Sequence, residues 1–206
     1  TFEELVEVVK CNLDEKRLEL IEPGKYERNE NGTVTIREKD KSGEAELLFS
    51  SKNEAISMHL EGGSSFSFLC NKKCADGIVF VKADEDIWDL HIIELKKTIS
   101  LKHWKKVKEQ FEGALIRALA VKGLLNINIG KVIFYTAYRR DKLSEKELEQ
   151  SEDTSLLRHP VGEPMSKPPV EDWQSEYYHV SWYEKGKHLK IQLDEEGKGA
   201  YTVTND

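Results

Sequence analysis

The chain has few cysteines and no long apolar run, and its first residues do not resemble a leader segment; each of these observations argues against a class of protein. Three cysteines in 206 residues exclude a small domain held together by many disulfides. No stretch approaches the ~20 apolar residues that a membrane-spanning helix needs. The first residues form neither a basic region nor an apolar one, so they do not resemble a secretory signal, and we expect a cytoplasmic protein.

The spacing of the cysteines argues against a structural zinc site. Cys70 and Cys74 form a C-x3-C pair, and Cys11 lies far away in the sequence. Tetrahedral zinc would need two further ligands, and no paired histidine or cysteine lies nearby. We therefore expect free thiols on either side of a turn.

Several common catalytic motifs are also missing. The chain has no glycine-rich G-x-x-x-x-G-K-[ST] loop, no G-x-G-x-x-G after a strand and no G-x-S-x-G turn. P-loop NTPases, dinucleotide-binding enzymes and serine hydrolases of the α/β type are therefore not expected. The six histidines show neither H-x3-H nor H-E-x-x-H spacing, so the sequence predicts no histidine-based metal centre.

Acidic residues outnumber basic ones overall, but the excess reverses in the middle of the chain. The net charge is −7, which argues against a generic nucleic-acid coat protein. Residues 1–95 carry a net charge of −9 and residues 141–206 carry −7, whereas residues 96–140 carry +9. A polyanion would meet this central basic block, although a solvated helix face gives the same charge pattern.

Hydrophobic spacing divides the chain into helical and extended segments. The helical period predicts helices over residues 2–11, with an extension toward residue 21, over 101–125 with Gly123 as its end signal, and over 144–151. Alternation and short apolar runs predict strands at 33–37, 45–50, 55–60, 65–70, 78–81, 88–97, 131–138, 177–183, 188–193 and 200–203. Asn31-Gly32, Gly186 and Gly197 are expected in hairpin turns, and residues 157–173 form a long proline-rich connection.

These segments predict one α/β domain with a mixed central sheet flanked by helices. We expect residues 1–206 to form a single domain with a core from about residue 54 to residue 140. Residues 1–53 would add helix and hairpin elements, and residues 141–206 would add a β-rich C-terminal extension.

One strand carries an acid and a lysine where apolar residues are expected. Glu94 and Lys96 are two residues apart, so they point to the same face of the strand at 88–97. Leu95 points to the other face, into the core. Asp76 directly precedes the strand at 78–81. If these two strands pair as an antiparallel hairpin, Asp76 is carried toward Glu94.

Two carboxylates and a lysine around one point suit the hydrolysis of a phosphodiester bond. Carboxylate oxygens are the ligands that Mg²⁺ or Mn²⁺ prefers, and the metal also binds phosphate oxygens and activates water. A lysine beside them can orient the attacking water and stabilise developing negative charge. Asp76 and Glu94 are therefore the candidate metal ligands, and Lys96 is the candidate catalytic lysine.

Asp76, the pair Glu94-x-Lys96 and the helix from about Lys102 resemble the PD-(D/E)xK nuclease superfamily. The core of that family is a helix, a three-stranded meander, a helix and a further strand, and residues 55–138 match this order. The resemblance implies a restriction-endonuclease-like fold and a metal-dependent endonuclease that cuts DNA. Ala75 stands where the family motif names proline.

The resemblance also implies supporting residues. Many members carry a glutamine on the helix after the E-x-K strand, and Gln110 is the candidate here. Many add a further glutamate, for which Glu54, Glu61 and Glu7 are all candidates. Members often act as homodimers, and restriction, phage defence, mobile-element and repair roles are all compatible with the family.

Helical spacing groups polar residues of the predicted helix at 101–125. Lys106, Gln110, Gly113 and Arg117 fall on one stripe, and the opposite stripe is apolar. The apolar stripe would pack on the sheet. Lys106 and Arg117 are therefore the candidate contacts to the DNA backbone.

The same residues also have plainer interpretations. Glu94 and Lys96 can form an ion pair on a solvent-facing strand, and Asp76-Gly77 is a common turn sequence. The chain would then be a non-catalytic interaction subunit of a defence or repair complex that keeps a nuclease-like fold. Catalysis requires the Asp76 and Glu94 carboxylates to meet, whereas the interaction alternative predicts that they point apart.

Overall fold

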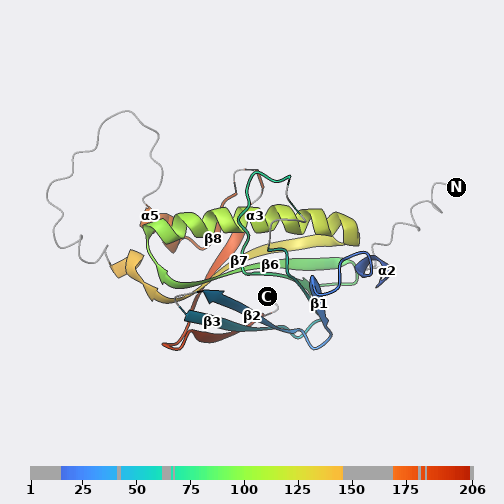
Figure 1. Cartoon of the computed structure of the whole chain (residues 1–206), viewed down its shortest axis with the longest axis horizontal. Helices are drawn as coiled ribbons and strands as arrows, with labels where there is room; N and C mark the ends of the chain where they lie inside the picture. The colour runs from blue at the N-terminus through green and yellow to red at the C-terminus, as the bar shows by residue number, and fades with distance from the viewer. Residues whose placement is uncertain are drawn as a thin grey trace.

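The computed structural model describes residues 15–40, 43–61, 66, 68–145, 169–180, 182–183 and 185–204, and it is a mixed α/β structure with two sheets (Figure 1). The helices are α2 (Glu15–Leu18), α3 (Leu101–Leu125) and α5 (Pro169–Gln174). The central sheet contains β1 (Tyr26–Asn29), β4 (Ala55–Met58), β5 (Gly77–Lys82), β6 (Ile87–Ile99), β7 (Asn128–Asp141), β8 (Tyr177–Tyr178) and β9 (Gly186–Gln192). The second sheet contains β2 (Thr33–Asp40), β3 (Gly43–Ser50) and β10 (Lys198–Thr202).

The central sheet mixes antiparallel and parallel pairing. Its seven strands follow the order β1-β4-β5-β6-β7-β9-β8. β4, β5 and β6 form an antiparallel meander, while β6, β7 and β9 run parallel to one another. α3 is the crossover between β6 and β7, because parallel neighbours need a long connection to return to the same end of the sheet. The predicted mixed central sheet is confirmed.

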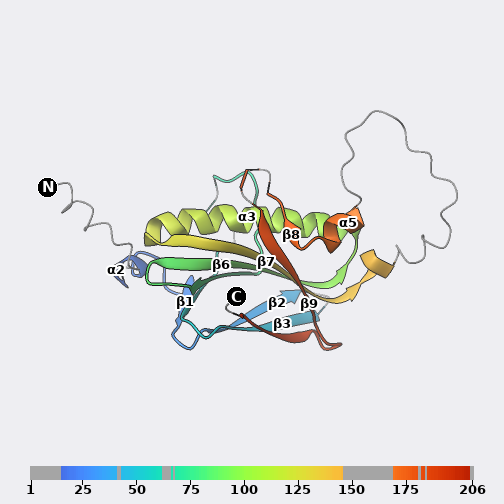
Figure 2. The same ribbon diagram turned by 180° about the vertical axis from the view of Figure 1, so that it is seen from behind.

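Each face of the central sheet is covered by a different layer. α3 lies along one face, and the second sheet lies against the other (Figure 1); Figure 2 shows the same layers from behind. Successive side chains of a strand point to opposite faces, so each strand feeds both layers. On β6, Ile92 packs with α3 and Ile93 packs with the second sheet. The structure therefore has two apolar cores, one on each side of the central sheet.

The helix over residues 101–125 is confirmed at both ends. Ser100 is the N-cap, and its hydroxyl accepts a hydrogen bond from the backbone N–H of His103. The helix ends at Asn126, whose φ of 56° is the left-handed conformation typical of a C-cap. Gly123, which the sequence favoured as the end signal, lies inside the helix.

Several other predictions are corrected. Residues 68–70 and Phe66 form turns and bends rather than the predicted strand at 65–70. β1 follows the first turn but was not predicted. Gly32 does occupy a turn, with φ 67°, yet it links β1 and β2, which belong to different sheets and form no hairpin.

The C-terminal residues are part of both sheets rather than an appended unit. β9 pairs with β7 in the central sheet, and β8 pairs with β9. β10 pairs parallel with β3 in the second sheet. Gly197, with φ 84°, makes the turn from β9 to β10 and so carries the chain from one sheet to the other. The predicted helix at 2–11 lies outside the described residues.

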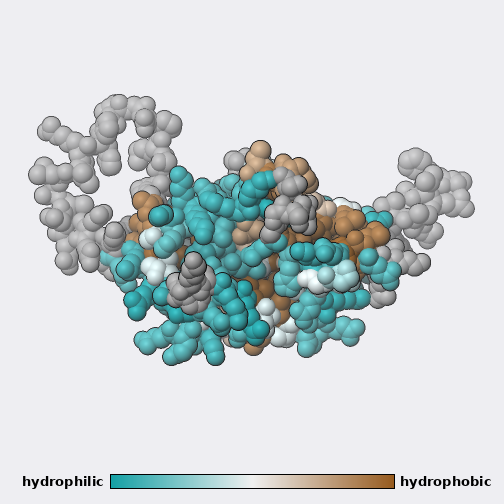
Figure 3. Space-filling view, viewed as in Figure 1, coloured by the Kyte–Doolittle hydropathy of each residue, from teal (hydrophilic) through white to brown (hydrophobic). Residues whose placement is uncertain are grey.

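The surface of the described residues is mainly polar. Figure 3 shows a largely hydrophilic face, on which hydrophobic residues are confined to smaller areas above and beside α3. Phe68, in the loop before β5, is the most exposed of the large apolar side chains named for the described residues. Within the described ranges, no helix is both long enough and apolar enough to cross a membrane.

Candidate metal and catalytic site

The hairpin of β5 and β6 brings Asp76 to Glu94, as predicted. Gly77 pairs with Ile93, so the residue before β5 meets β6 beside Glu94 and Leu95. The backbone N–H of Leu95 donates to Asp76 Oδ2 at 2.7 Å. The Asp76 carboxylate therefore accepts a hydrogen bond that a backbone carbonyl of a neighbouring strand would otherwise accept. This contact fixes the carboxylate beside β6, just before β5 begins.

Glu94 and Lys96 are both buried on the same strand. Their exposed fractions are 0% and 7%. Lys96 Nζ forms an ion pair with Glu94 Oε1 and donates to the carbonyl of Leu95 at 2.9 Å. This burial excludes the alternative of a solvent-facing ion pair, because charges leave water only where partners or a function hold them.

Two further carboxylates approach this pair from other strands. Glu61, three residues beyond the end of β4, hydrogen-bonds the Asp76 side chain. Glu38 of β2 places its Oε1 3.8 Å from Lys96 Nζ. We call Glu38, Glu61, Asp76, Glu94 and Lys96 the acidic cluster. The central sheet and the second sheet both contribute to it.

Of the three glutamates predicted as a further ligand, only Glu61 joins the acidic cluster among the described residues. Glu54 forms an ion pair with Arg28 beside β1 and β4, near the opposite end of β5 from Asp76. Glu7 lies outside the described residues. Glu38 was not predicted, but the sequence held a signal for it: Val34 and Ile36 are buried, and alternation places Glu38 on the same face of β2.

Burial and mutual repulsion disfavour negative charge in the acidic cluster. Burial, and then the charge of Glu94, raise the pKa of Asp76 to about 9. Burial also raises the pKa of Glu94 to about 7, although Lys96 opposes the shift. Partial burial and repulsion from Glu38 raise the pKa of Glu61. These carboxylates lack enough positive charge around them, since Lys96 is the one ammonium in the cluster.

Lys96 stays protonated in this environment. Burial lowers its pKa, but the charges of Glu94 and Asp76 outweigh that effect, so the net shift is upward. A lysine that keeps its proton can hold and stabilise negative charge, and it is a poor general base.

The acidic cluster fits a divalent cation in its chemistry. Glu94 Oε2 is buried and has no hydrogen-bond partner among the described residues, so one carboxylate oxygen is left available. All the acidic side chains offer oxygen, which Mg²⁺ and Mn²⁺ prefer. Within the described ranges, however, no three His, Cys, Asp or Glu side chains stand close enough together to hold a metal ion as they are placed.

Gln110 lies above the acidic cluster on α3. The helix rises about 1.5 Å per residue and a strand about 3.3 Å, so the nine residues that follow Leu101, up to Gln110, run back along about four residues of β6, to the region of Lys96. Gln110 Nε2 donates to the carbonyl of Cys74 at 3.2 Å, two residues before Asp76. Its Oε1 is buried without a partner among the described residues.

The two predicted phosphate contacts on α3 differ in exposure. Lys106 is exposed near the N-terminal end of the helix. Arg117 is 3% exposed, and its guanidinium donates to backbone carbonyls of the loop before β5. This placement argues against the predicted contact between Arg117 and DNA, because the guanidinium is buried and its Nη1 and Nη2 donate to carbonyls inside the protein.

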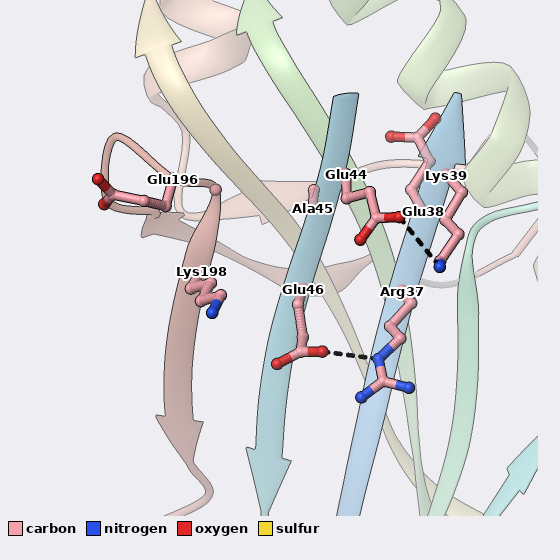
Figure 4. Close-up of a pocket in the computed structure, with 9 residues that line it drawn as sticks. Arg37, Glu38, Lys39, Glu44, Ala45, Glu46, Glu196 and Lys198 are labelled. Carbon is pink, nitrogen blue, oxygen red and sulfur yellow. Dashed lines mark hydrogen bonds and ion pairs between the residues drawn. The ribbon is translucent and has the colours of Figure 1, made fainter. Parts of the chain in front are cut away.

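A small charged pocket of about 120 Å³ lies beside Glu38 on the second sheet. Arg37 pairs with Glu46 at 2.6 Å, and Lys39 pairs with Glu44 at 3.0 Å. Figure 4 shows these pairs side by side on β2 and β3, with Glu38 turned away from the Lys39–Glu44 pair. Because its neighbours already pair with one another, Glu38 is the β2 carboxylate that remains for Lys96.

The two described cysteines do not form a metal site. Cys70 is exposed and Cys74 is buried, and both are free thiols. Burial raises the pKa of Cys74 to about 12, so it stays a neutral thiol. This agrees with the expectation of free thiols. Cys11 lies outside the described residues.

Comparison with protein-family models, with curated proteins and with solved structures found no match. The features of this chain that indicate a function are therefore the acidic cluster and the elements that carry it.

Proposed function

We propose that this protein is a Mg²⁺-dependent endonuclease that hydrolyses phosphodiester bonds in DNA. The observation that carries the proposal is the meeting of half-buried Asp76 with the buried pair Glu94 and Lys96, with one Glu94 oxygen left without a partner among the described residues. Like charges that are buried together destabilise a fold unless a bound cation compensates them. Strongly shifted pKa values around a specific charge partner are also typical of functional sites.

The order of the elements supports a core like that of the PD-(D/E)xK nucleases. β4, β5 and β6 form a meander, α3 follows, and β7 lies parallel to β6. Asp76 precedes the second strand of this meander, and Glu94-x-Lys96 lies on the third. We infer a restriction-endonuclease-like core over about residues 54–140, to which the second sheet is an addition that supplies Glu38.

The residues divide the chemistry between them. Asp76 and Glu94 would hold Mg²⁺ or Mn²⁺, with Glu61 as the further carboxylate. When bound, the metal supplies positive charge at the scissile phosphate and lowers the pKa of a coordinated water. Lys96 orients that water and stabilises charge on the phosphate oxygens. The water oxygen would form a bond to phosphorus as the bond from phosphorus to the leaving oxygen breaks; the water would give up a proton to solvent, and the leaving oxygen would take one from solvent.

The basic block supports a polyanionic substrate. α3 has no acidic residue in its first turn, and Lys102, Lys105 and Lys106 are exposed there. These ammonium groups would contact phosphates without reading bases, so they would contribute salt-dependent affinity. Lys106 keeps its predicted role in this proposal, and Arg117 does not.

A homodimer in which each copy cuts one strand fits the proposed chemistry, as do restriction, phage defence, mobile-element and repair functions. The alternative is a non-catalytic subunit that keeps the nuclease-like fold within a defence or repair complex. The net charge of −7 favours that alternative, because it disfavours general binding to nucleic acid.

Metal-dependent cleavage of plasmid and linear DNA tests the proposal. Wild-type protein is compared with Glu94→Ala and Lys96→Ala, and with Glu54→Ala as a matched control outside the acidic cluster. We expect cleavage that needs Mg²⁺ or Mn²⁺, is lost in the first two variants and persists in the control. A folded wild-type protein that cuts neither substrate with either metal would favour the interaction alternative. Cleavage that survives in both cluster variants would contradict the assigned site.

A further inference from the structure

Arg117 is a buried arginine with no acidic partner among the described residues; its hydrogen bonds go to backbone carbonyls, and its guanidinium lies 5.6 Å from the centre of the Phe66 ring. Nη1 donates to the carbonyl of Lys73 at 2.8 Å and to that of Gly113, one turn back on α3, at 2.8 Å. Nη2 lies 3.4 Å from the carbonyl oxygen of Asn71 and 3.3 Å from that of Lys72. One guanidinium therefore binds three consecutive carbonyls of the loop that enters β5.

Gly113 lets this loop lie directly on α3. A methyl group added at Gly113 would overlap the carbonyl oxygen of Lys73, so the loop and the helix touch through backbone alone at this point. Gly123 on the same helix has open space in the same position. The close approach is therefore specific to the turn of α3 that faces the loop.

The loop held in this way leads directly to Asp76. Asn71 Nδ2 donates to the carbonyl of Glu109 at 2.8 Å, and Gln110 holds Cys74, so contacts with α3 continue to two residues before Asp76. Asp76 itself lies outside β5 and gains no position from the strand ladder. Its placement is set by the loop behind it and by the N–H of Leu95 in front of it.

We propose that Arg117 and Gly113 are positioning residues for Asp76. α3 follows β6 directly, so the helix that holds the Asp76 loop is anchored to the strand that carries Glu94. Arg117 and Gly113 thus fix the separation of the two carboxylates from the α3 side. The role in metal binding rests on the proposed nuclease function, whereas the role in placing Asp76 does not.

The Leu95 amide reports the position of Asp76 without any metal or substrate. Its hydrogen bond to Asp76 Oδ2 slows exchange of the amide hydrogen with solvent, and it weakens if the carboxylate moves. Gly113→Ala is compared with Gly123→Ala, the same substitution on the same helix in open space. We expect Gly113→Ala to speed exchange at Leu95 by about tenfold while amides of the β5–β6 ladder are unchanged, and Gly123→Ala to leave Leu95 unchanged.

Arg117→Lys provides a second variant that keeps the charge and loses the planar fork. It should also speed exchange at Leu95, and it should raise the Mn²⁺ concentration for half-maximal cleavage by about tenfold while the maximal rate changes less. Equal exchange at Leu95 in wild type, Gly113→Ala and Arg117→Lys would overturn the positioning role. Faster exchange in a protein that binds no Mn²⁺ would keep the positioning role and reject the nuclease proposal.

Discussion

Strand β6 contributes to two sets of polar residues, and the chemistry of the two sets differs. In the acidic cluster, Asp76 and Glu94 share the single ammonium of Lys96. Nearby, His91 Nδ1 lies 2.8 Å from the hydroxyl of Tyr135, and burial lowers the His91 pKa to about 3. Glu94 and His91 are 0% and 1% exposed, so burial does not distinguish the two sets.

The distinction is charge rather than depth. A buried histidine with a lowered pKa is neutral at ordinary pH, and its hydroxyl partner satisfies one ring nitrogen at little cost. A second neutral pair, His188 Nε2 and Thr136 Oγ1 at 3.0 Å, occupies the strands beside Glu94. A neutral hydrogen-bond partner cannot satisfy the Asp76 and Glu94 carboxylates in the same way, because neutralising them requires a proton or a cation. Charge, and not burial alone, therefore distinguishes the acidic cluster from the histidine pairs.

The largest effect expected from this comparison is on cleavage. Asp76→Asn keeps the shape and the acceptor for the Leu95 N–H but removes a metal-ligating charge, so we expect activity to fall by about 10³-fold or more. Its folding stability at pH 8 should stay equal or increase, because the unfolded chain no longer gains stability by ionising a carboxyl that the fold keeps protonated. His91→Gln should do the opposite, with activity within about tenfold and a loss of about 1–3 kcal/mol of stability. Cleavage rates and urea unfolding measure both, and equal loss of activity in the two variants would contradict the distinction.

The next effect is the stabilisation of the fold by a divalent cation. The folded carboxyls of Asp76 and Glu94 keep protons that the unfolded chain releases above pH ~4, so stability without metal should decline as the pH rises toward about 9. A bound cation replaces those protons. At a Mn²⁺ concentration about 100-fold above the Kd at pH 8.5, Mn²⁺ should add about 2–3 kcal/mol to the stability at pH 8.5. The same concentration should add less at pH 6, because protons compete with the cation. Thermal unfolding at the two pH values checks this, and a larger effect at pH 6 would contradict it.

The histidines should produce a smaller dependence of opposite sign. Burial lowers the pKa of His91 and of His188 to about 3, so below pH ~6.5 the unfolded chain binds protons that the folded chain does not. Stability should therefore fall as the pH drops from 6.5 toward 4, by about 1 kcal/mol per pH unit for each histidine. His91→Gln should reduce this slope in urea unfolding, and an unchanged slope would show that His91 is not buried in its neutral form.

The smallest effect separates Glu38, which the sequence did not predict, from Glu54, which it predicted as a candidate ligand. Glu38 faces Lys96, whereas Glu54 pairs with Arg28 outside the acidic cluster. Glu38→Gln should raise the Mn²⁺ concentration for half-maximal cleavage by about two- to fivefold, because one nearby charge of several is removed. Glu54→Gln should leave it unchanged. Equal values for the two variants would remove Glu38 from the site.

The sequence predicted which residues meet at the centre of the acidic cluster, because its signals are local. Alternation put Glu94 and Lys96 on one face, and a short polar connection between two apolar runs predicted the hairpin that brings Asp76 beside them. The helix at 101–125 followed from its period and was confirmed.

What the sequence could not predict depends on contacts between distant segments. Glu38 reaches Lys96 only because the second sheet packs on the central one, and the pairing of β10 with β3 across some 150 residues leaves no local trace. The sequence predicted Arg117 as a contact to DNA, because the backbone carbonyls of residues 71–73 that it binds leave no signature in the side-chain pattern. Phe66 and Phe68 alternated like a strand, yet they lie in turns.

Mn²⁺ binding measured by electron paramagnetic resonance of the free ion tests the central claim most directly. Titration at pH 8 of wild type, Asp76→Asn and His91→Gln needs neither a substrate nor an assumed partner. The structure predicts saturable binding by wild type and His91→Gln, weakened at least about tenfold in Asp76→Asn. Absence of saturable binding in wild type, or equal binding in all three proteins, would contradict the assignment of the acidic cluster as a cation site.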